Sequence, residues 1–261
     1  TGGMRETSVL IVGGGPVGLA LAGELGWRGV DCLLVEQTDG AITTPKMNEV
    51  NLRTMEHCRR WGIAQAVIDC PFPKDYPMDI ALVTKLGGYE MGRMRRPAKR
   101  DQKPGPSSPV NYQICSQLWF DPILRRFAGS HPAVELRHRF RLDSFVETAT
   151  GIEAVITDLD DGPNGDGRTT DDQGGRVRAR WLAACDGATS AIRTQRGIRL
   201  EGHHVLGRPI HFFFRAPRLL HDFGVAPATF FLACDKEGLW ANIRIIDPAT
   251  GLWRLMVLDT P

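Results

Sequence analysis

The feature that most constrains the fold is the stretch SVLIVGGGPVGLALAGELGWRGVDCLLVEQ at residues 8–37. An apolar run enters a glycine turn in which Gly13, Gly15 and Gly18 have the spacing G-x-G-x-x-G. An Ala/Leu-rich helical segment follows, and then a second apolar run that ends in Glu36. Strand, glycine turn, helix, strand and acid in this order predict a βαβ unit that holds a dinucleotide.

Each glycine of the turn has a separate physical task in this interpretation. Gly13 permits the tight turn out of the strand, and Gly15 lets a pyrophosphate approach the backbone because it has no side chain. Gly18 lets the helix pack closely on the sheet. The helix N-terminus offers free N–H groups to the phosphates. Pro16 and Val17, at the start of this helix, also belong to the predicted cofactor site.

The acid at the end of the second apolar run is the predicted ribose contact. Glu36 can accept hydrogen bonds from ribose hydroxyls and would repel a 2′-phosphate, and the adjacent Gln37 is expected to lie beside the same group. The fingerprint alone does not separate FAD from NAD. A purely structural turn is the alternative interpretation of the glycines.

Composition excludes several other classes of protein. The chain has 261 residues, 42% hydrophobic and 24% charged, with a formal net charge of +2. This balance gives no argument for a nucleic-acid partner, and no apolar run approaches the roughly 20 residues of a membrane span. A basic run lacks interleaved aromatic residues, and we interpret it as a solvated loop or lid: Arg93, Arg95, Arg96, Lys99, Arg100 and Lys103.

The cysteines and histidines show no metal-ligand spacing. The six cysteines are scattered without a C-x-x-C pair, which is typical of reduced thiols in a cytoplasmic protein. His203 and His204 are merely adjacent in a polar turn. No metal site is predicted.

The remaining sequence predicts alternating elements and then a β-rich region. Helices are expected from about Asn48 to Trp61 and from Gln117 onward. Residues 70–110 are expected to form irregular loops around a short strand at 80–84. The Gly/Asp-rich segment 160–175 predicts a long hairpin connection. Strands are expected at 134–137, 141–148, 151–159, 177–184, 210–214, 229–233, 239–246 and 253–258.

A second motif, LAACDGATSAIR, occupies residues 182–193. It predicts a strand that ends at Asp186 and Gly187 and a helix with Ser190 as N-cap and Arg193 in its first turns. A strand–turn–helix junction of this kind is common by itself. After a dinucleotide fingerprint, the Asp186 carboxylate is a candidate contact for the phosphate and ribose region.

Together these motifs resemble the FAD-dependent aromatic hydroxylases of the p-hydroxybenzoate hydroxylase type, in particular the phenol and 3-hydroxyphenylpropionate hydroxylase branch. The D-G-x-x-S-x-x-R motif begins at Asp186, and Gln117 in ICSQLWFDPIL looks like the family glutamine that touches the flavin end of FAD. Arg53 looks like the family's helix arginine that reaches the cofactor, and Lys46 stands where many members have an arginine.

The resemblance implies a mixed α/β fold that is discontinuous in sequence. A Rossmann-like FAD-binding domain of parallel sheet and helices would comprise residues 1–70 and 109–202. A β-rich substrate-binding domain would comprise residues 71–108 and 203–261. The family's third motif, a G-D-A-A-H-like segment, is not found in this sequence, so we expect the chain to be C-terminally truncated relative to the family and its substrate domain to be incomplete.

The resemblance also implies the chemistry. NAD(P)H would reduce FAD, O2 would add to give a flavin C4a-hydroperoxide, and a phenolic or related aromatic substrate would be hydroxylated. No catalytic residue is assigned. His211 and Arg244 are candidate anchors for a phenol oxygen or carboxylate, and a set of aromatic residues is expected on substrate-domain strands: Phe212, Phe213, Phe214, Phe230, Phe231 and Trp240.

Three alternatives stay open at this point. The chain could belong to a related flavoenzyme with other chemistry, such as a reductase or halogenase, although the halogenase segment W-x-W-x-I-P is not found. It could be a cofactor-free fragment of the hydroxylase, and a plain NAD-dependent dehydrogenase fits the second motif poorly. The oligomeric state also stays open, and a homodimer is possible.

Overall fold

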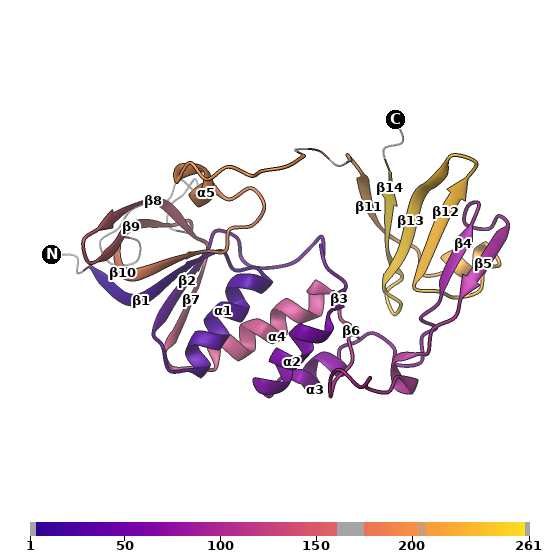
Figure 1. The fold of residues 1–261 in the computed structure, drawn as a ribbon, viewed down its shortest axis with the longest axis horizontal. Coiled ribbons are helices and arrows are strands. Elements are labelled where there is room, and N and C mark those ends of the chain that lie inside the picture. Colours follow the sequence, from indigo (N-terminus) through magenta and orange to yellow (C-terminus); the bar gives the residue numbers. More distant parts are fainter. Residues whose placement is uncertain (1–3, 161–174, 204, 206, 259–261) are drawn as a thin grey trace. The chain divides into compact units, whose positions relative to one another are not determined.

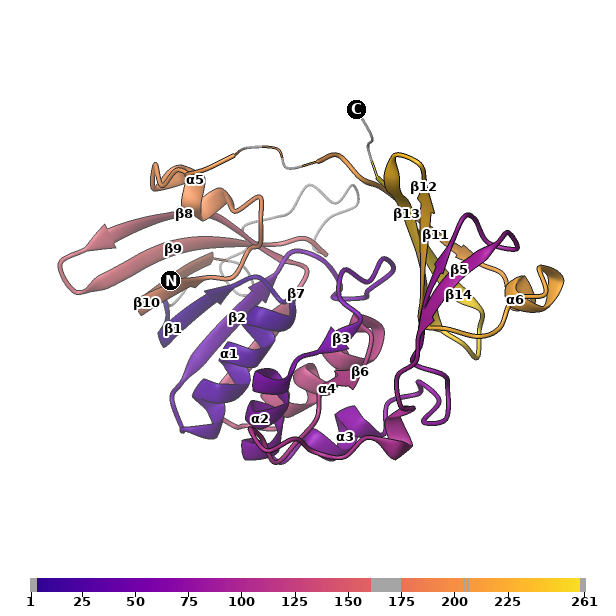
Figure 2. The same cartoon turned by 45° about the vertical axis from the view of Figure 1, so that its right-hand side comes forward.

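The computed structural model describes residues 4–160, 175–203, 205 and 207–258. The chain divides into two compact units (Figures 1 and 2). Unit 1 comprises residues 1–43 and 120–200, and unit 2 comprises residues 44–119 and 201–261. Each unit is described by itself.

Unit 1 is built on a six-stranded sheet of order β7-β2-β1-β10-β9-β8. The first four strands in this order are parallel, and β9 and β8 are antiparallel to their neighbours. The strands are β1 (Arg5–Val12), β2 (Cys32–Glu36), β7 (Val134–His138), β8 (Phe140–Thr148), β9 (Gly151–Asp158) and β10 (Gly175–Ala184). The helices are α1 (Pro16–Trp27), α4 (Gln117–Gly129), which begins at the unit boundary, and α5 (Ala191–Gln195).

The central strands of this sheet are apolar because both of their faces are covered. Ile11 and Leu34 are fully buried, as expected of parallel strands with helices on the sheet. Helix α1 lies against α4 (Figure 2), and a Cβ atom on Gly23 would come within 2.5 Å of the Phe127 ring. On the other face, Ile192 of α5 joins a core that includes residues of β1, β2, β8, β9 and β10.

Unit 2 is built on a second six-stranded sheet, of order β11-β14-β13-β12-β4-β5. Only β12 and β4 pair in parallel within it, and a separate two-stranded sheet joins β3 to β6. The strands are β3 (Glu49–Val50), β4 (Ile80–Val83), β5 (Glu90–Met94), β6 (Gln113–Ile114), β11 (Ile210–Arg215), β12 (Phe230–Asp235), β13 (Gly238–Asp247) and β14 (Leu252–Val257). The helices are α2 (Leu52–Arg60), α3 (Ala64–Ile68), the 3-10 turn η1 (Lys99–Asp101) and α6 (Leu219–Asp222).

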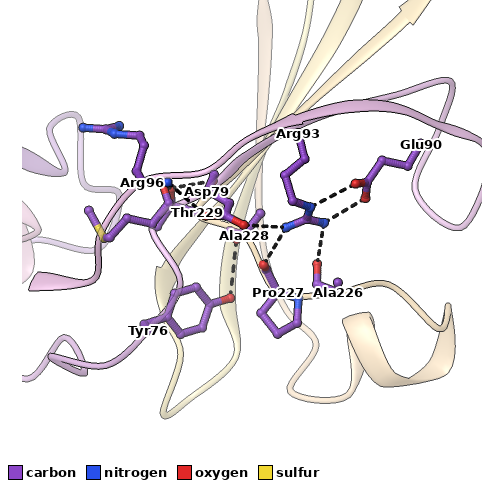
Figure 3. A network of polar contacts seen from close by, with 10 residues as sticks. Tyr76, Asp79, Glu90, Arg93, Arg96, Ala226, Pro227, Ala228 and Thr229 are labelled. Atoms are coloured by element: carbon purple, nitrogen blue, oxygen red, sulfur yellow. Dashed lines mark hydrogen bonds and ion pairs between the residues drawn. The ribbon is translucent and has the colours of Figure 1, made fainter. Parts of the chain in front are cut away.

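An arginine on the edge strand β5 fastens that strand to the chain preceding β12 (Figure 3). Arg93 pairs with Glu90 at 2.8 Å and with Asp79 at 3.2 Å, and it donates to the carbonyls of Pro227 and Ala226. Its side chain is only 10% exposed. The solvated-loop interpretation of the basic run is therefore wrong for Arg93, because this residue is sequestered by five acceptor atoms of carboxylates and carbonyls.

The predicted elements are found in the structure, but the short elements α3, η1, α6, β3 and β6 were not predicted. Two further differences are informative. Helix α2 begins at Leu52, not at about 48, because Glu49 and Val50 pair with β6 and Asn51 caps the helix through Thr54 N–H. Strand β5 was not predicted, since its sequence EMGRM has no β-branched or aromatic residue. The predicted hairpin connection at 160–175 lies, except for its two end residues, outside the described residues.

The observed α/β architecture, with a mainly parallel sheet and a separate β-rich unit, matches the predicted fold class. The compact units group the chain somewhat differently from the predicted domains, since 44–70, 109–119 and 201–202 belong to unit 2. Which residues form the cofactor domain and which the substrate domain remains a functional prediction.

Candidate functional site: three strand ends in unit 1

The glycine turn after β1 has a backbone that only glycine fits at two positions. Gly13 has φ of +109°, and a Cβ atom there would lie 2.3 Å from the carbonyl oxygen of Cys185. A Cβ atom on Gly18 would lie 1.9 Å from the carbonyl oxygen of Gly13. Gly13 therefore allows the tight turn from β1 into α1, beside the end of β10, and Gly18 allows the first turns of α1 to lie against the Gly13 carbonyl.

The second glycine of the motif faces open space. Nothing lies within 4 Å of the position that a Cβ atom on Gly15 would take. Gly15 is the N-cap of α1, no side chain caps the helix, and its first turn contains Pro16 but no acidic residue. Val17 in that turn is 68% exposed. An accessible, uncapped helix N-terminus of this kind suits a pyrophosphate.

The acid at the end of β2 is held against the glycine turn. Oε2 of Glu36 accepts a hydrogen bond from Gly14 N at 2.7 Å, and Oε1 accepts from both Thr38 N and Thr38 Oγ1 at 2.8 Å. A Cβ atom on Gly14 would lie 2.7 Å from the Cβ of Glu36. The carboxylate keeps acceptor capacity beyond these three bonds, because a carboxylate offers about four lone-pair positions. Gln37 next to it is exposed.

Asp186 follows β10, the other parallel neighbour of β1. Its carboxylate accepts from Ser190 Oγ at 2.6 Å and from Ile192 N at 3.3 Å. Ser190 Oγ in turn accepts from Arg193 N at 3.0 Å, which confirms the predicted N-cap. Asp186 therefore shapes the start of α5, and its backbone N would lie 3.0 Å from a Cβ atom on Gly13.

These groups meet because β2, β1 and β10 are adjacent and parallel, so their carboxyl ends lie at one edge of the sheet. Ligands of open parallel sheets bind at this edge. The open approach at Gly15, the uncapped helix end and the spare acceptor capacity of Glu36 fit the ADP part of a dinucleotide. The sequence interpretation missed Gly14 and Thr38; the middle glycine of GGG was the available signal for the former.

Two predicted cofactor residues belong to unit 2. Gln117, 7% exposed, accepts from Lys46 N at 2.9 Å through its side chain and donates to Met47 O at 3.0 Å through its backbone N–H. Arg53 pairs with Glu56 at 2.7 Å and is 75% exposed. Their contact with a cofactor stays a prediction.

The candidate substrate residues differ in their surroundings. Phe231 is fully buried and packs in the core of unit 2, whereas Phe212 is 49% exposed. Arg244 is 9% exposed, and its guanidinium lies 4.2 Å from the Phe230 ring centroid. His211 is exposed, and slight burial followed by repulsion from Arg254 lowers its pKa.

The six cysteines of the chain are all free thiols. Burial raises the pKa of both Cys32 and Cys58 to about 11.

Among the described residues, no helix combines the length and the apolar content that crossing a bilayer requires.

Comparison with known proteins assigns the chain to a family. A family model described as "FAD binding domain" matches residues 6–238. The chain is 35% identical over 225 residues to tetracenomycin B2 monooxygenase-dioxygenase of Streptomyces olivaceus, covering 81% of this chain and 39% of that protein. It is 32% identical over 212 residues to 4-methyl-5-nitrocatechol 5-monooxygenase of a Burkholderia species, covering 81% of this chain and 36% of the relative.

Solved structures show the same fold. The substrate-free form of the rebeccamycin biosynthetic enzyme RebC superposes with a TM-score of 0.86 at 39% identity, over 99% of this chain and 48% of RebC. A complex of aklavinone-11 hydroxylase with FAD and aklavinone gives a TM-score of 0.80 at 26% identity, over 99% of this chain and 47% of that one. The chain thus spans less than half the length of each of these relatives. By the extent of the family match, it belongs to the FAD-binding-domain family of proteins.

Proposed function

We propose that this chain is the FAD-binding part of a monooxygenase that hydroxylates a phenolic or related aromatic substrate with NAD(P)H and O2. The observation that carries the proposal is the meeting of the glycine turn, Glu36 and the Asp186 segment at one sheet edge. The family match and the monooxygenase relatives support it.

The residues at the sheet edge would bind and orient the adenosine half of FAD. The first turn of α1 would donate N–H groups to the pyrophosphate across the open side of Gly15. Glu36 would accept from the ribose hydroxyls while keeping its bonds to Gly14 and Thr38. Bound FAD would supply the redox chemistry with NAD(P)H and O2, and the protein would position the aromatic ring and exclude water.

The domain assignment is part of the same proposal. Residues 1–70 and 109–202 would hold the cofactor, with Gln117 and Arg53 toward its flavin end, and residues 71–108 and 203–261 would bind the substrate. The two observed sheets support a division of labour between a mainly parallel and a mainly antiparallel unit. The six free thiols suit a reducing compartment, and we propose the cytoplasm.

The test is spectroscopic and kinetic. The whole protein is purified, its absorbance is recorded in the flavin bands, and NAD(P)H oxidation is followed with and without a phenol. We expect a yellow protein whose NAD(P)H oxidation is stimulated by a phenol, with a hydroxylated product. A protein that binds no flavin contradicts the proposal, and stimulated NAD(P)H oxidation without ring oxygenation assigns it to another flavoenzyme reaction.

A further inference from the structure

Two buried thiols of unit 2 lie beside each other although they are far apart in the sequence. Cys70, which follows α3, is 6% exposed, and Cys115, which follows β6, is fully buried. Sγ of Cys70 lies 3.2 Å from the carbonyl oxygen of Ile114, the residue that precedes Cys115. The side chains of the two cysteines are also hydrogen-bonded to each other. We call Cys70 and Cys115 the thiol pair.

A lysine of η1 holds its ammonium group at the thiol pair. Nζ of Lys99 donates to Sγ of Cys70 at 3.6 Å and to the carbonyl oxygens of Ile68 and Ile114, both at 3.3 Å. Ile68 ends α3 and Ile114 ends β6, so the two carbonyls come from the segments that carry the two cysteines. An ammonium group has three donors, and these three acceptors fix it against the sulfur.

This arrangement favours the thiolate form of Cys70. The hydrogen bond from Cys115, and then the charge of Lys99, lowers the pKa of Cys70 to about 6, although burial acts in the opposite direction. The hydrogen bond to Cys70, and then burial, raises the pKa of Cys115. The neighbouring carboxylate, Asp69, is paired with Lys74. One member of the pair is therefore a nucleophile, and the other is a protonated thiol beside it.

Two other cysteines of unit 2 provide comparisons. Cys58 of α2 is fully buried, and burial raises its pKa to about 11; it is also near enough to act on Cys115. Cys234 of β12 is half-buried and thus more exposed than Cys70. Among the described residues, neither Cys58 nor Cys234 accepts a hydrogen bond from a lysine. Exposure and thiolate character therefore favour different cysteines.

We infer that the thiol pair is a redox-active site, at which a hydroperoxide such as hydrogen peroxide oxidises Cys70 and Cys115 to a disulfide. Cys70 is the attacking thiol and Cys115 the resolving thiol. Lys99 is a positioning residue that stabilises the Cys70 thiolate. Nothing in this reaction requires bound flavin, so the inference stands or falls separately from the proposed function.

The reaction has two steps. The Cys70 thiolate attacks one oxygen of the peroxide, so that an S–O bond forms and the O–O bond breaks; the hydroxide that leaves takes a proton from solvent and becomes water. The sulfur of Cys115 then attacks the sulfenic acid of Cys70, so that the S–S bond forms and the S–O bond breaks. The second hydroxide takes the Cys115 proton. Two thiols thus lose two electrons, and one peroxide is reduced to two waters.

The contact between the two side chains suits the second step. A disulfide requires an S–S distance of about 2.05 Å. Because the two thiols are already hydrogen-bonded, the Cys115 sulfur is next to the atom that it attacks. A sulfenic acid with an adjacent thiol condenses to a disulfide instead of being oxidised further.

The test follows each thiol of the purified whole protein after treatment with hydrogen peroxide at pH 7. Free thiols are alkylated, the protein is digested without reduction, and the peptides are identified by mass spectrometry. We expect the Cys70 and Cys115 peptides to be joined, about 2 Da lighter than the sum of the two reduced peptides, and to separate on treatment with dithiothreitol. Cys58 and Cys234 should remain free and become alkylated.

Variants separate the roles of the three side chains. C115S lacks the resolving sulfur, so Cys70 should accumulate as a sulfenic acid that dimedone traps. K99M loses the charge that favours the thiolate, so the rate of Cys70 oxidation at pH 6 should fall about 5-fold or more, and K99R should restore part of it. K103M removes an exposed lysine nearby in the sequence, and it should react as the wild type does. Thermal unfolding of each variant verifies that it is folded.

The pH dependence gives a further check on the wild type. Its rate of Cys70 oxidation should be half-maximal near pH 6, and a midpoint at or above about pH 8.5, where an ordinary thiol titrates, would contradict the inference. Oxidation of Cys234 before Cys70, a product that joins Cys70 to Lys99 or to another cysteine, or a wild-type rate in folded K99M at pH 6 would each overturn it as well.

Discussion

The carboxylate of Glu36 accepts a hydrogen bond from the backbone N–H of Gly14 at 2.7 Å. Glu36, the last residue of β2, thereby holds in place the glycine turn that follows the neighbouring strand β1. The same carboxylate holds the chain after β2 through both donors of Thr38. Glu36 is therefore a support for the turn as well as the predicted ribose contact.

This double role predicts the effect of E36Q. The amide keeps the shape but loses the charge, so FAD affinity should fall about 10-fold, or 1.4 kcal/mol, as titrated by flavin fluorescence. E147Q, which changes an exposed glutamate of β8 in the same unit, is the control and should bind FAD as the wild type does. Unchanged affinity in E36Q would refute the ribose contact.

The cap of α5 predicts a measurable loss of stability in S190A. Ser190 Oγ accepts from Arg193 N and donates to Asp186, and both bonds disappear with the hydroxyl. We expect a loss of about 1 kcal/mol in the free energy of unfolding, measured by urea denaturation. S8A removes an exposed hydroxyl on β1 and should change this quantity little; an equal loss in both variants would show that the cap contributes nothing.

The Arg93 network predicts a larger effect in unit 2. R93M leaves Asp79, whose side chain is 11% exposed, without its guanidinium partner, so we expect a loss of about 3 kcal/mol. R95Q changes a neighbouring exposed arginine and should cost less than about 0.5 kcal/mol. Chemical denaturation measures both variants, and similar small losses would contradict the structural role of Arg93.

His138 predicts a pH dependence of stability. Burial, and then the positive charge of Arg125, lowers the pKa of His138 in the folded protein, and its Nε2 is buried without a partner. The unfolded state therefore binds the proton more readily, and stability falls as the pH drops below about 6.5. H138N should reduce the loss of unfolding free energy between pH 7 and pH 5; an unchanged loss would exclude this histidine as its source.

The sequence predicted the local geometry of the strand ends in unit 1 because its determinants are local, and the contact of these residues with FAD stays a prediction. The φ of Gly13, the close packing at Gly18 and the cap at Ser190 each follow from a few consecutive residues. The parallel pairing of β1 with β2 follows from the βαβ pattern, whereas the position of β10 beside β1 was not predicted. Asp186 also accepts a hydrogen bond from Ser190, the N-cap of α5, and the spacing of the D-G-x-x-S-x-x-R motif does not reveal this structural role.

What escaped prediction depends on contacts between distant segments. Strand β5 has no β-branched or aromatic residue, and its Arg93 donates to carbonyl groups at residues 226 and 227, far along the chain. The late start of α2 results from the pairing of β3 with β6, far along the chain.

The most direct test of the central claim is the FAD affinity of G15A, with G18A beside it. Ala fits at residue 15 in the cofactor-free protein, where nothing lies within 4 Å, so its stability should stay within about 1 kcal/mol of the wild type. Its methyl group would occupy the approach of the pyrophosphate, so FAD affinity should fall about 10-fold or more. G18A should instead lose stability, because its Cβ would lie 1.9 Å from Gly13 O. A folded G15A that binds FAD as tightly as the wild type would contradict a pyrophosphate site at this turn.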